Sequence, residues 1–166
     1  MTLSKLNNAE PDQAYLLFES CCCAPNWVKQ MVQSRPFSDA QSLFNQAQTV
    51  WDSLQDSDFL AAFEGHPQIG DLSTLQKKYA STSDTAGHEQ AGMSVAKQDV
   101  LQQMADLNKE YLSRFGFIFI VCASGKSAEQ MLELIQSRIN NPPEVELQVA
   151  AQEQAKITQI RLEKLL

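Results

Sequence analysis

The chain has little of what several classes of protein need. Of its 166 residues, 13 are Lys or Arg against 20 Asp or Glu, which gives a formal net charge of -7. Nucleic-acid binding is disfavoured, because neutralising phosphates requires a basic surface. No apolar run approaches the roughly 20 residues of a membrane span, and the N-terminal stretch lacks the apolar core of a secretion signal. The final EKLL is not a Ser-Lys-Leu peroxisomal address, so we expect a cytoplasmic protein without a membrane partner.

Cysteine and histidine are also scarce, with four and two residues. Cys21, Cys22 and Cys23 are consecutive and Cys122 stands alone, which suits neither a disulfide framework nor the paired spacing of a zinc site. We interpret them as reduced thiols. The stretch HEQAG, beginning at His88, lacks the second histidine of HExxH, so any metal site would have to be rich in carboxylates. A phosphate-binding glycine loop and a Gly-x-Ser-x-Gly elbow are missing as well.

Helical periodicity is what the chain has in abundance. With 43% hydrophobic residues it can bury a sizeable core, and neither a repeat nor a long linker divides residues 1–166, so we expect a single all-α domain. Ser38 and Ser127 each precede a glutamine by three residues, which is capping-box spacing. The small residues of 81–87 predict a loop. We expect helices over about residues 12–22, 27–33, 38–54, 56–65, 72–80, 88–114, 127–140 and 144–166.

One apolar stretch does not fit this pattern. FGFIFIVCA, residues 115–123, has the β-branched and aromatic content of a buried strand. A strand needs partners, and no second convincing strand is found. An isolated strand would leave its main-chain polar groups unpaired, so we expect a buried irregular or helical segment that crosses the helical core. Such a segment could offer main-chain N–H and C=O groups to a ligand.

A histidine stands in a stiff turn in GHPQIGD, residues 65–71. Pro67 restricts His66 to extended geometry, and the flanking glycines permit tight turns, so the imidazole should be held at a fixed angle. This makes His66 a candidate for acid-base chemistry, since its proton titrates near neutral pH. A turn in which the histidine only packs or caps explains the same residues.

Two further polar positions are candidates. In AGHEQAG, residues 86–92, His88, Glu89 and Gln90 come together at a helix start, where a glutamate is also favoured by the helix dipole alone. Arg161 stands in an otherwise apolar part of the last helix. Its guanidinium fork could bind an anionic substrate or form an ordinary ion pair. From these residues alone the ion pair is the favoured reading.

Four separated motifs together resemble a known family. HPQIGD, HEQAG, FGFIFIVCASGKSAEQML and AAQEQAKITQIRLEKLL, in this order, resemble the 2-oxo-4-hydroxy-4-carboxy-5-ureidoimidazoline (OHCU) decarboxylases of urate breakdown. The likeness covers nearly the whole chain. It implies an all-helical fold, a homodimer, and a cofactor-free decarboxylation that gives (S)-allantoin and carbon dioxide, with no metal.

The resemblance also implies roles for individual residues. His66 matches the family's catalytic histidine, and Glu89 matches the glutamate of its Glu-Gln pair, a second catalytic candidate. Arg161 is similar to an arginine near the substrate. The family often has arginine at Gln68 and serine at Ala86, so a hydroxyl contact at Ala86 is in doubt while a main-chain contact survives. The implied substrate contacts are Pro67, Ala86, Gly87, His88, Glu89, Gln90, Phe119, Ile120, Val121, Cys122, Ala123 and Arg161.

Two other functions fit the same residues. One is a metal-assisted hydrolase of a ureide or cyclic amide that uses His66, His88, Glu89 and Asp71. The other is a non-catalytic helical interaction module, in which these motifs only build core and turns. Metal analysis and a thermal shift with allantoin or a related ureide would separate the three.

Overall fold

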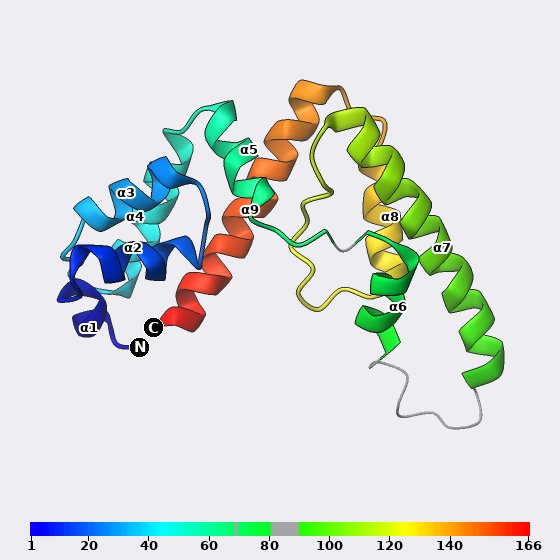
Figure 1. The fold of residues 1–166 in the computed structure, drawn as a ribbon, viewed down its shortest axis with the longest axis horizontal. Coiled ribbons are helices and arrows are strands. Elements are labelled where there is room, and N and C mark those ends of the chain that lie inside the picture. The colour runs from blue at the N-terminus through cyan, green and yellow to red at the C-terminus, as the bar shows by residue number, and fades with distance from the viewer. Residues whose placement is uncertain (69, 81–89) are drawn as a thin grey trace. The chain divides into compact units, whose positions relative to one another are not determined.

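The computed structural model describes residues 1–68, 70–80 and 90–166, without the side chains of 80 and 90–96. Within these ranges all regular secondary structure is helical, which confirms the all-α prediction (Figure 1). The helices form two compact units. The first contains residues 1–66, 120–122 and 147–166, and the second contains residues 67–119 and 123–146. No helix in the described ranges is long and apolar enough to cross a membrane.

The first unit is built from short helices and the larger part of the C-terminal one. Its helices are α1 (Leu3–Asn7), α2 (Pro11–Glu19), α3 (Pro25–Gln33), α4 (Ala40–Asp52), α5 (Asp56–Glu64) and, from residue 147 on, α9 (Pro143–Leu165). Proline opens α2 and α3, since a first-turn residue needs no N–H bond. The predicted cap at Ser38 is wrong. The N-cap of α4 is Asp39, whose carboxylate accepts from the Ser42 N–H at 2.6 Å.

Aromatic side chains form the core of the first unit. Phe18 meets the fully buried Trp27 edge to face, with ring centroids 6.0 Å apart. The indole N–H of Trp27 donates to the Ala47 carbonyl and that of Trp51 to the Ala151 carbonyl, both at 3.1 Å. Both buried polar groups are thereby satisfied. The Trp51 bond joins α4 to α9, the helix that carries Gln154 and Thr158.

The second unit consists of three helices and the start of a fourth, with a buried ion pair between Arg138 and Glu146. Its helices are α6 (Leu72–Ala80), α7 (Gln90–Phe115), α8 (Ala128–Arg138) and the first turn of α9. The predicted capping box at Ser127 is confirmed, because its hydroxyl accepts from the Gln130 N–H at 3.2 Å. Gly116 has a φ of +78°, the left-handed conformation that ends many helices, and it follows α7 directly.

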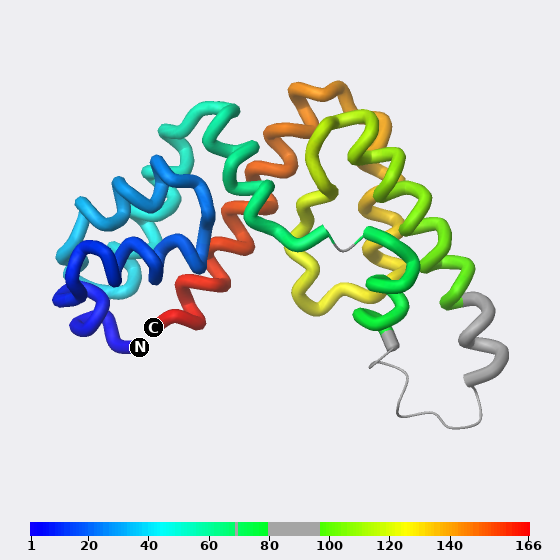
Figure 2. The backbone as a smooth tube through the Cα atoms, viewed as in Figure 1, coloured from blue at the N-terminus to red at the C-terminus, as the bar shows by residue number. Residues whose placement is uncertain are grey.

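The strand-like stretch, residues 115–123, is irregular after Phe115, as predicted, but less buried than predicted, because Ile120 is its one buried residue. An aromatic cluster explains its composition. Tyr111 packs against the rings of Phe115, Phe117 and Phe119, with centroids 4.6, 5.8 and 5.2 Å away. The Tyr111 hydroxyl donates to Glu146 at 2.5 Å. Residues 115–123 are therefore apolar because their aromatic rings pack in this cluster, and not because they form a strand of a buried sheet. Figure 2 follows this segment between α7 and α8.

The buried carboxylate of Glu146 is fully paired. Arg138 donates to it through Nε at 2.7 Å, and the Asn141 amide donates at 2.9 Å. The Arg138 guanidinium also lies 4.5 Å from the centroid of the Phe119 ring. Removing one partner of such a pair would leave an uncompensated buried charge. We assign this cluster a structural role, because its donors and acceptors are used on one another.

Candidate functional site

His66 lies where α5 ends. Gly65 is the C-cap of α5, and the His66 N–H donates to the Phe63 carbonyl at 3.1 Å. This main-chain bond closes a turn directly after the helix, at His66. The side chain is half-buried, whereas the following Pro67 and Gln68 are exposed. A turn is therefore present at His66, with the imidazole as its partly enclosed group, and Gly65 adopts an ordinary helical conformation in it.

The imidazole is anchored by a buried amide from the C-terminal helix. His66 Nε2 and Gln154 Oε1 are 2.5 Å apart, although the two residues are 88 positions apart in the sequence. The Gln154 amide nitrogen donates to Thr158 Oγ1 at 3.2 Å, and the Thr158 hydroxyl donates to the Gln154 main-chain carbonyl at 3.0 Å. We call His66, Gln154 and Thr158 the His66 network. Gln154 is 1% exposed and Thr158 5% exposed, so the two members of the network on α9 are shielded from water, whereas the His66 ring is half-buried.

The surroundings favour a neutral imidazole. Burial lowers the pKa of His66 below its ordinary value of 6.5, the hydrogen bond with Gln154 opposes this, and the positive charge of Arg161 adds to the lowering. The neutral form therefore dominates at pH 7, and a neutral imidazole is the form that can accept a proton.

Arg161 stands on the same face of α9 as the His66 network. Residues 154, 158 and 161 are spaced by four and three, which places them one above the other on a helix. Arg161 Nη1 donates to the Cys21 carbonyl at 3.2 Å. We expected an ion pair at Arg161, but in the described part of the chain none is found there. Its guanidinium binds a main-chain carbonyl instead. An arginine has five N–H donors, so it can hold a carbonyl and an anion together.

The irregular segment reaches the same helix. Ile120 is 2% exposed, and residues 120–122 belong to the first unit. The Cys122 N–H donates to Glu153 Oε1 on α9 at 3.4 Å. The structure thus places His66, Ile120, Val121, Cys122 and Arg161 in one compact unit. Phe119 and Ala123 belong to the second unit, where the Phe119 ring packs on Tyr111.

Four predicted contacts lie outside the described residues: Ala86, Gly87, His88 and Glu89. Gln90 begins α7, and its side chain is not described. The predicted loop over 81–87 falls in the same gap. Their contacts with the substrate stay predictions, and so does the role of the Glu89–Gln90 pair.

The three consecutive cysteines are free thiols, with Cys21 and Cys22 buried and Cys23 partly buried. Burial raises the pKa of Cys21, and it raises the pKa of Cys22 to about 11. A thiol that stays protonated is a poor nucleophile and a poor metal ligand. The reduced-thiol interpretation therefore agrees with their surroundings.

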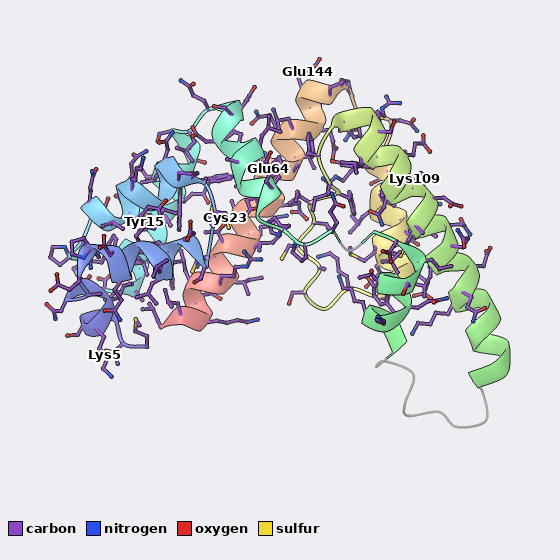
Figure 3. All side chains as sticks on the ribbon, in the orientation of Figure 1. Lys5, Tyr15, Cys23, Glu64, Lys109 and Glu144 are labelled. Atoms are coloured by element: carbon purple, nitrogen blue, oxygen red, sulfur yellow. The ribbon has the colours of Figure 1, made fainter. Side chains whose placement is uncertain are left out.

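Close packing at Gly65 leads to a first prediction. A Cβ added there would lie 2.4 Å from the Cys23 sulfur, although the φ of -72° would suit any residue. Figure 3 labels Cys23 and Glu64, the residue before Gly65. We expect Gly65→Ala to lower the free energy of unfolding by about 1–3 kcal/mol, as overpacking does. Urea denaturation measures this loss.

The control separates the clash from other effects of the substitution. In the Gly65→Ala/Cys23→Gly double variant both close neighbours, the sulfur and Cβ of Cys23, are removed. The double variant should regain stability relative to the sum of the two single changes. Strict additivity would show that the contact with Cys23 is not the reason for glycine at this position.

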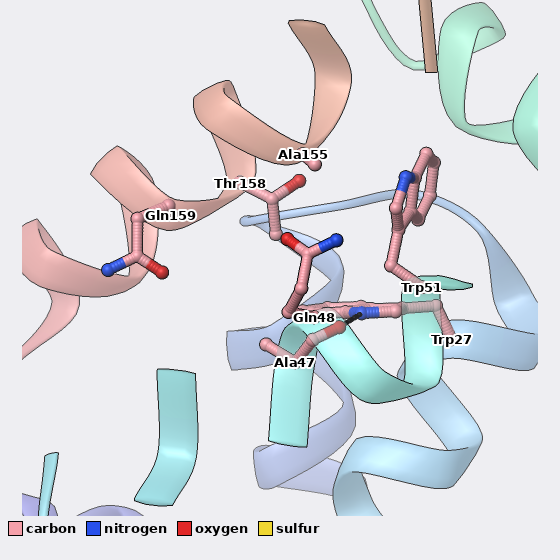
Figure 4. Close-up of a pocket in the computed structure, with 7 residues that line it drawn as sticks. All are labelled: Trp27, Ala47, Gln48, Trp51, Ala155, Thr158 and Gln159. Carbon is pink, nitrogen blue, oxygen red and sulfur yellow. Dashed lines mark hydrogen bonds between the residues drawn. The ribbon is translucent and has the colours of Figure 1, made fainter. Parts of the chain in front are cut away.

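A pocket in the first unit lies apart from His66. Figure 4 shows Thr158 of α9 pointing toward Gln48 of α4 in this pocket. Its lining residues are Trp27, Ala47, Gln48, Trp51, Ala155, Thr158 and Gln159. Thr158 links it to the His66 network, but the pocket holds neither His66 nor Arg161. We therefore place the candidate site at His66 rather than in this pocket.

Sequence reasoning missed Gln154 and Thr158. Their signal is the spacing of polar residues at 154, 158 and 161 along a face that carries Ala150 and Leu162, both fully buried. A polar side chain on an apolar helix face is buried when the helix packs, and it then needs a partner. The sequence could indicate that these side chains need a partner, but not that His66, two residues after the end of α5, is that partner.

Comparison with known proteins agrees with the resemblance found in the motifs. The family model for OHCU decarboxylase matches residues 7–163. A uric acid degradation bifunctional protein of Arabidopsis thaliana is 35% identical over 87% of this chain and 45% of its own length. The OHCU decarboxylase of Amia calva is 31% identical over 80% of this chain and 75% of its own. The chain spans less than half of the first two curated relatives, both bifunctional proteins.

A solved structure is similar over almost the whole chain. A crystal structure of OHCU decarboxylase in the presence of (S)-allantoin covers 95% of this chain, and this chain covers 98% of it, with 35% identity and a TM-score of 0.72. A structure of (S)-allantoin synthase, at 18% identity and a TM-score of 0.70, shares the fold.

Proposed function

The chain belongs to the OHCU decarboxylase family, and on that premise we propose that it converts OHCU into (S)-allantoin and carbon dioxide. The observation that carries the proposal is the likeness to the OHCU decarboxylase structure obtained with (S)-allantoin, which extends over nearly all of both chains. The bifunctional relatives are named for uric acid degradation, which supports a place for this carboxy-lyase reaction in urate breakdown.

The chemistry needs orientation and proton transfer rather than a cofactor. One ring carbon of OHCU carries the carboxylate and a hydroxyl, beside a ring C=N bond. When the carbon–carboxylate bond breaks, its electron pair forms a new double bond to the neighbouring ring carbon, the C=N electrons move to the ring nitrogen, which takes up a proton, and carbon dioxide leaves. The resulting enol-type intermediate gains a proton on carbon and loses the hydroxyl proton. The protein must hold the carboxylate and manage these two protons.

We assign proton transfer to His66, and binding of an anionic group of the substrate to Arg161. A half-buried imidazole with a lowered pKa can take the hydroxyl proton or deliver one to carbon. The guanidinium fork suits a carboxylate or another anionic group of the substrate. Glu89 and Gln90 are assigned to the ureido group or to tuning His66, and Phe119–Ala123 to the substrate's surroundings. Protonation of a planar intermediate from one side would fix the hand of the product.

Stereospecific product formation tests the proposed function. Freshly generated OHCU decays spontaneously to racemic allantoin, so the enzyme should produce an optically active product at a faster rate. Circular dichroism of the accumulating allantoin measures both. Racemic product at the spontaneous rate with the folded protein would overturn the decarboxylase assignment.

The pH dependence follows from the environment of His66. If the neutral imidazole is the active form, kcat/KM should be at its plateau at pH 7 and fall as the pH drops through a pKa below 6.5, because burial lowers the pKa of His66. A pH profile of kcat/KM measures this. An acid limb centred above 6.5 would show that another group limits the reaction.

The metal-assisted hydrolase remains the alternative with a simple test. Among the described residues no three His, Cys, Asp or Glu side chains gather in a way that could hold a metal ion. His88 and Glu89, two of its proposed ligands, lie outside that part of the chain. We expect full activity after exhaustive chelation and removal of the chelator. A loss that zinc or manganese restores would favour the hydrolase.

We further propose a cytoplasmic homodimer in which residues 1–166 form one family domain. The family match over 7–163 supports the single domain, and the resemblance is the support for the dimer. Light scattering checks the dimer, where a concentration-independent monomer would remove it. Microscopy of a protein tagged away from its C-terminus checks the location.

A further inference from the structure

Gln154 joins His66 to the C-terminal helix α9. Gln154 is almost completely buried, and both ends of its amide are engaged: Oε1 with His66 Nε2 and Nε2 with Thr158 Oγ1. A buried amide in contact with two polar groups has a defined direction only if those groups define it. Here Thr158 does so.

The Thr158 hydroxyl has a single proton. It donates that proton to the Gln154 main-chain carbonyl, at 3.0 Å one helical turn back. Toward the Gln154 side chain the hydroxyl can therefore only accept, so the amide NH₂ faces Thr158 and the amide oxygen faces His66. The reverse amide orientation would require the same proton for the amide oxygen and would take it from the main-chain carbonyl.

This direction fixes the tautomer of His66. An amide oxygen only accepts, so His66 Nε2 must carry a hydrogen and donate it at 2.5 Å. In the neutral ring Nδ1 is then the nitrogen with the free lone pair. The contact survives protonation of the ring, because Nε2 keeps its hydrogen in the imidazolium. Proton uptake and release are thus confined to Nδ1.

We propose that Gln154 is a positioning residue, which holds His66 as the Nε2–H tautomer and makes Nδ1 the atom that exchanges a proton with the substrate. The second half of this proposal rests on the proposed function; the tautomer does not. A neutral amide suits the task, because it orients the ring as a carboxylate would without holding a proton on it.

Among the described residues, the other titratable groups near His66 do not replace this contact. Arg161 acts on His66 through its charge and opposes protonation. Cys22 hydrogen-bonds to Thr158, and with a pKa of about 11 it remains a thiol across the working range. Cys23 lies against Gly65, the residue before His66, and its thiol donates to the Glu19 carbonyl. Among these groups Gln154 is the one that accepts a hydrogen bond from the ring.

Nuclear magnetic resonance of the intact chain tests the tautomer without any substrate. With ¹⁵N-labelled histidine, the two histidines give two ring patterns, and the pattern missing in His66→Asn belongs to His66. Above the pKa of His66, we expect a protonated Nε2 and an unprotonated Nδ1. A protonated Nδ1, or a fast mixture of both tautomers, would overturn the proposal whatever the enzyme's activity.

Three variants test the positioning role. Gln154→Leu fills the same space without the amide and should lower kcat by roughly 10-fold to 100-fold, as loss of an orienting partner does, with KM changed far less. Thr158→Val keeps the amide but frees its direction, so the His66 pattern should become a tautomer mixture. Gln154→Glu keeps an acceptor and adds a charge that favours the imidazolium, so the acid limb of kcat/KM should move to higher pH.

The matched control is Gln152→Leu, the same substitution at an exposed position of the same helix, which should leave kcat and the His66 pattern unchanged. If Gln154→Leu does not fold, the tautomer of the wild-type protein and the pH profile of Gln154→Glu decide whether Gln154 positions His66. If the acid limb of kcat/KM is unchanged in folded Gln154→Glu, the side chain at position 154 does not contact His66 and the proposal is wrong. Inactive wild-type protein with the expected tautomer would remove the proposed function and leave the assignment of Nε2–H standing.

Discussion

His66→Asn should slow enzymatic decarboxylation by about 100-fold to 10,000-fold, the usual contribution of general acid-base catalysis. Asparagine keeps polarity but has no titratable proton, and it is too short to reproduce the contact with Gln154. Spontaneous decay of OHCU would continue, so the product should lose optical activity together with rate. Circular dichroism of the accumulating allantoin measures both effects in one experiment.

Folding must be separated from chemistry in this variant. The Gln154 amide oxygen would lose its partner, and an unsatisfied buried acceptor costs about 1–3 kcal/mol, so the variant should be somewhat less stable but still folded. The far-ultraviolet spectrum checks this. Glu64→Gln, an exposed change at the last residue of α5, two positions before His66, is the control and should keep full activity. If folded His66→Asn still made (S)-allantoin at close to the wild-type rate, Glu89 would become the first residue to test.

The helices were predictable because their signals are local. Pro11 opens α2, Ser127 caps α8 and Gly116 follows the end of α7, each by geometry that a few neighbouring residues determine. The error at Ser38 is also local. Ser38 and Asp39 are both good caps, and the sequence favoured the one with glutamine three residues on, whereas the structure uses the carboxylate of Asp39.

The irregular segment was predictable in part. The lack of a second strand excluded a sheet, but nothing in the spacing indicated that Tyr111 and Arg138 would pack around Phe119. Such contacts join residues from different helices, and their geometry arises only when the helices pack. The same limit applies to Gln154, which lies 88 positions from His66.

The candidate site was therefore found by residue type and resemblance rather than by geometry. His66 stood out because a stiff turn surrounds it, and Arg161 because its neighbours are apolar. The structure adds that Gln154, Thr158 and Arg161 share one face of α9, which neither motif indicated. The His66 ring is oriented by a tertiary contact between its turn and a helix that is distant in the sequence.

The other large effect is expected at Arg161. Arg161→Lys keeps the positive charge but replaces a planar fork of five donors by one ammonium group. In the structure one guanidinium N–H is bound to the Cys21 carbonyl at 3.2 Å. Lysine would have to divide a single nitrogen between that carbonyl and the substrate. Loss of one hydrogen bond to a charged group costs about 1.5–3 kcal/mol, so kcat/KM should fall by roughly 10-fold to 100-fold, mainly through KM.

Arg161→Met distinguishes an anion-binding role from a structural one. It removes the cation, so the decrease in kcat/KM should exceed that of Arg161→Lys, and the acid limb of the pH profile should move up, because the Arg161 charge lowers the pKa of His66. Lys164→Met, which removes an exposed cation from the same helix, should change neither quantity. If Arg161 only held the Cys21 carbonyl, both arginine variants would lose stability at an unchanged KM, and the substrate carboxylate would need another partner.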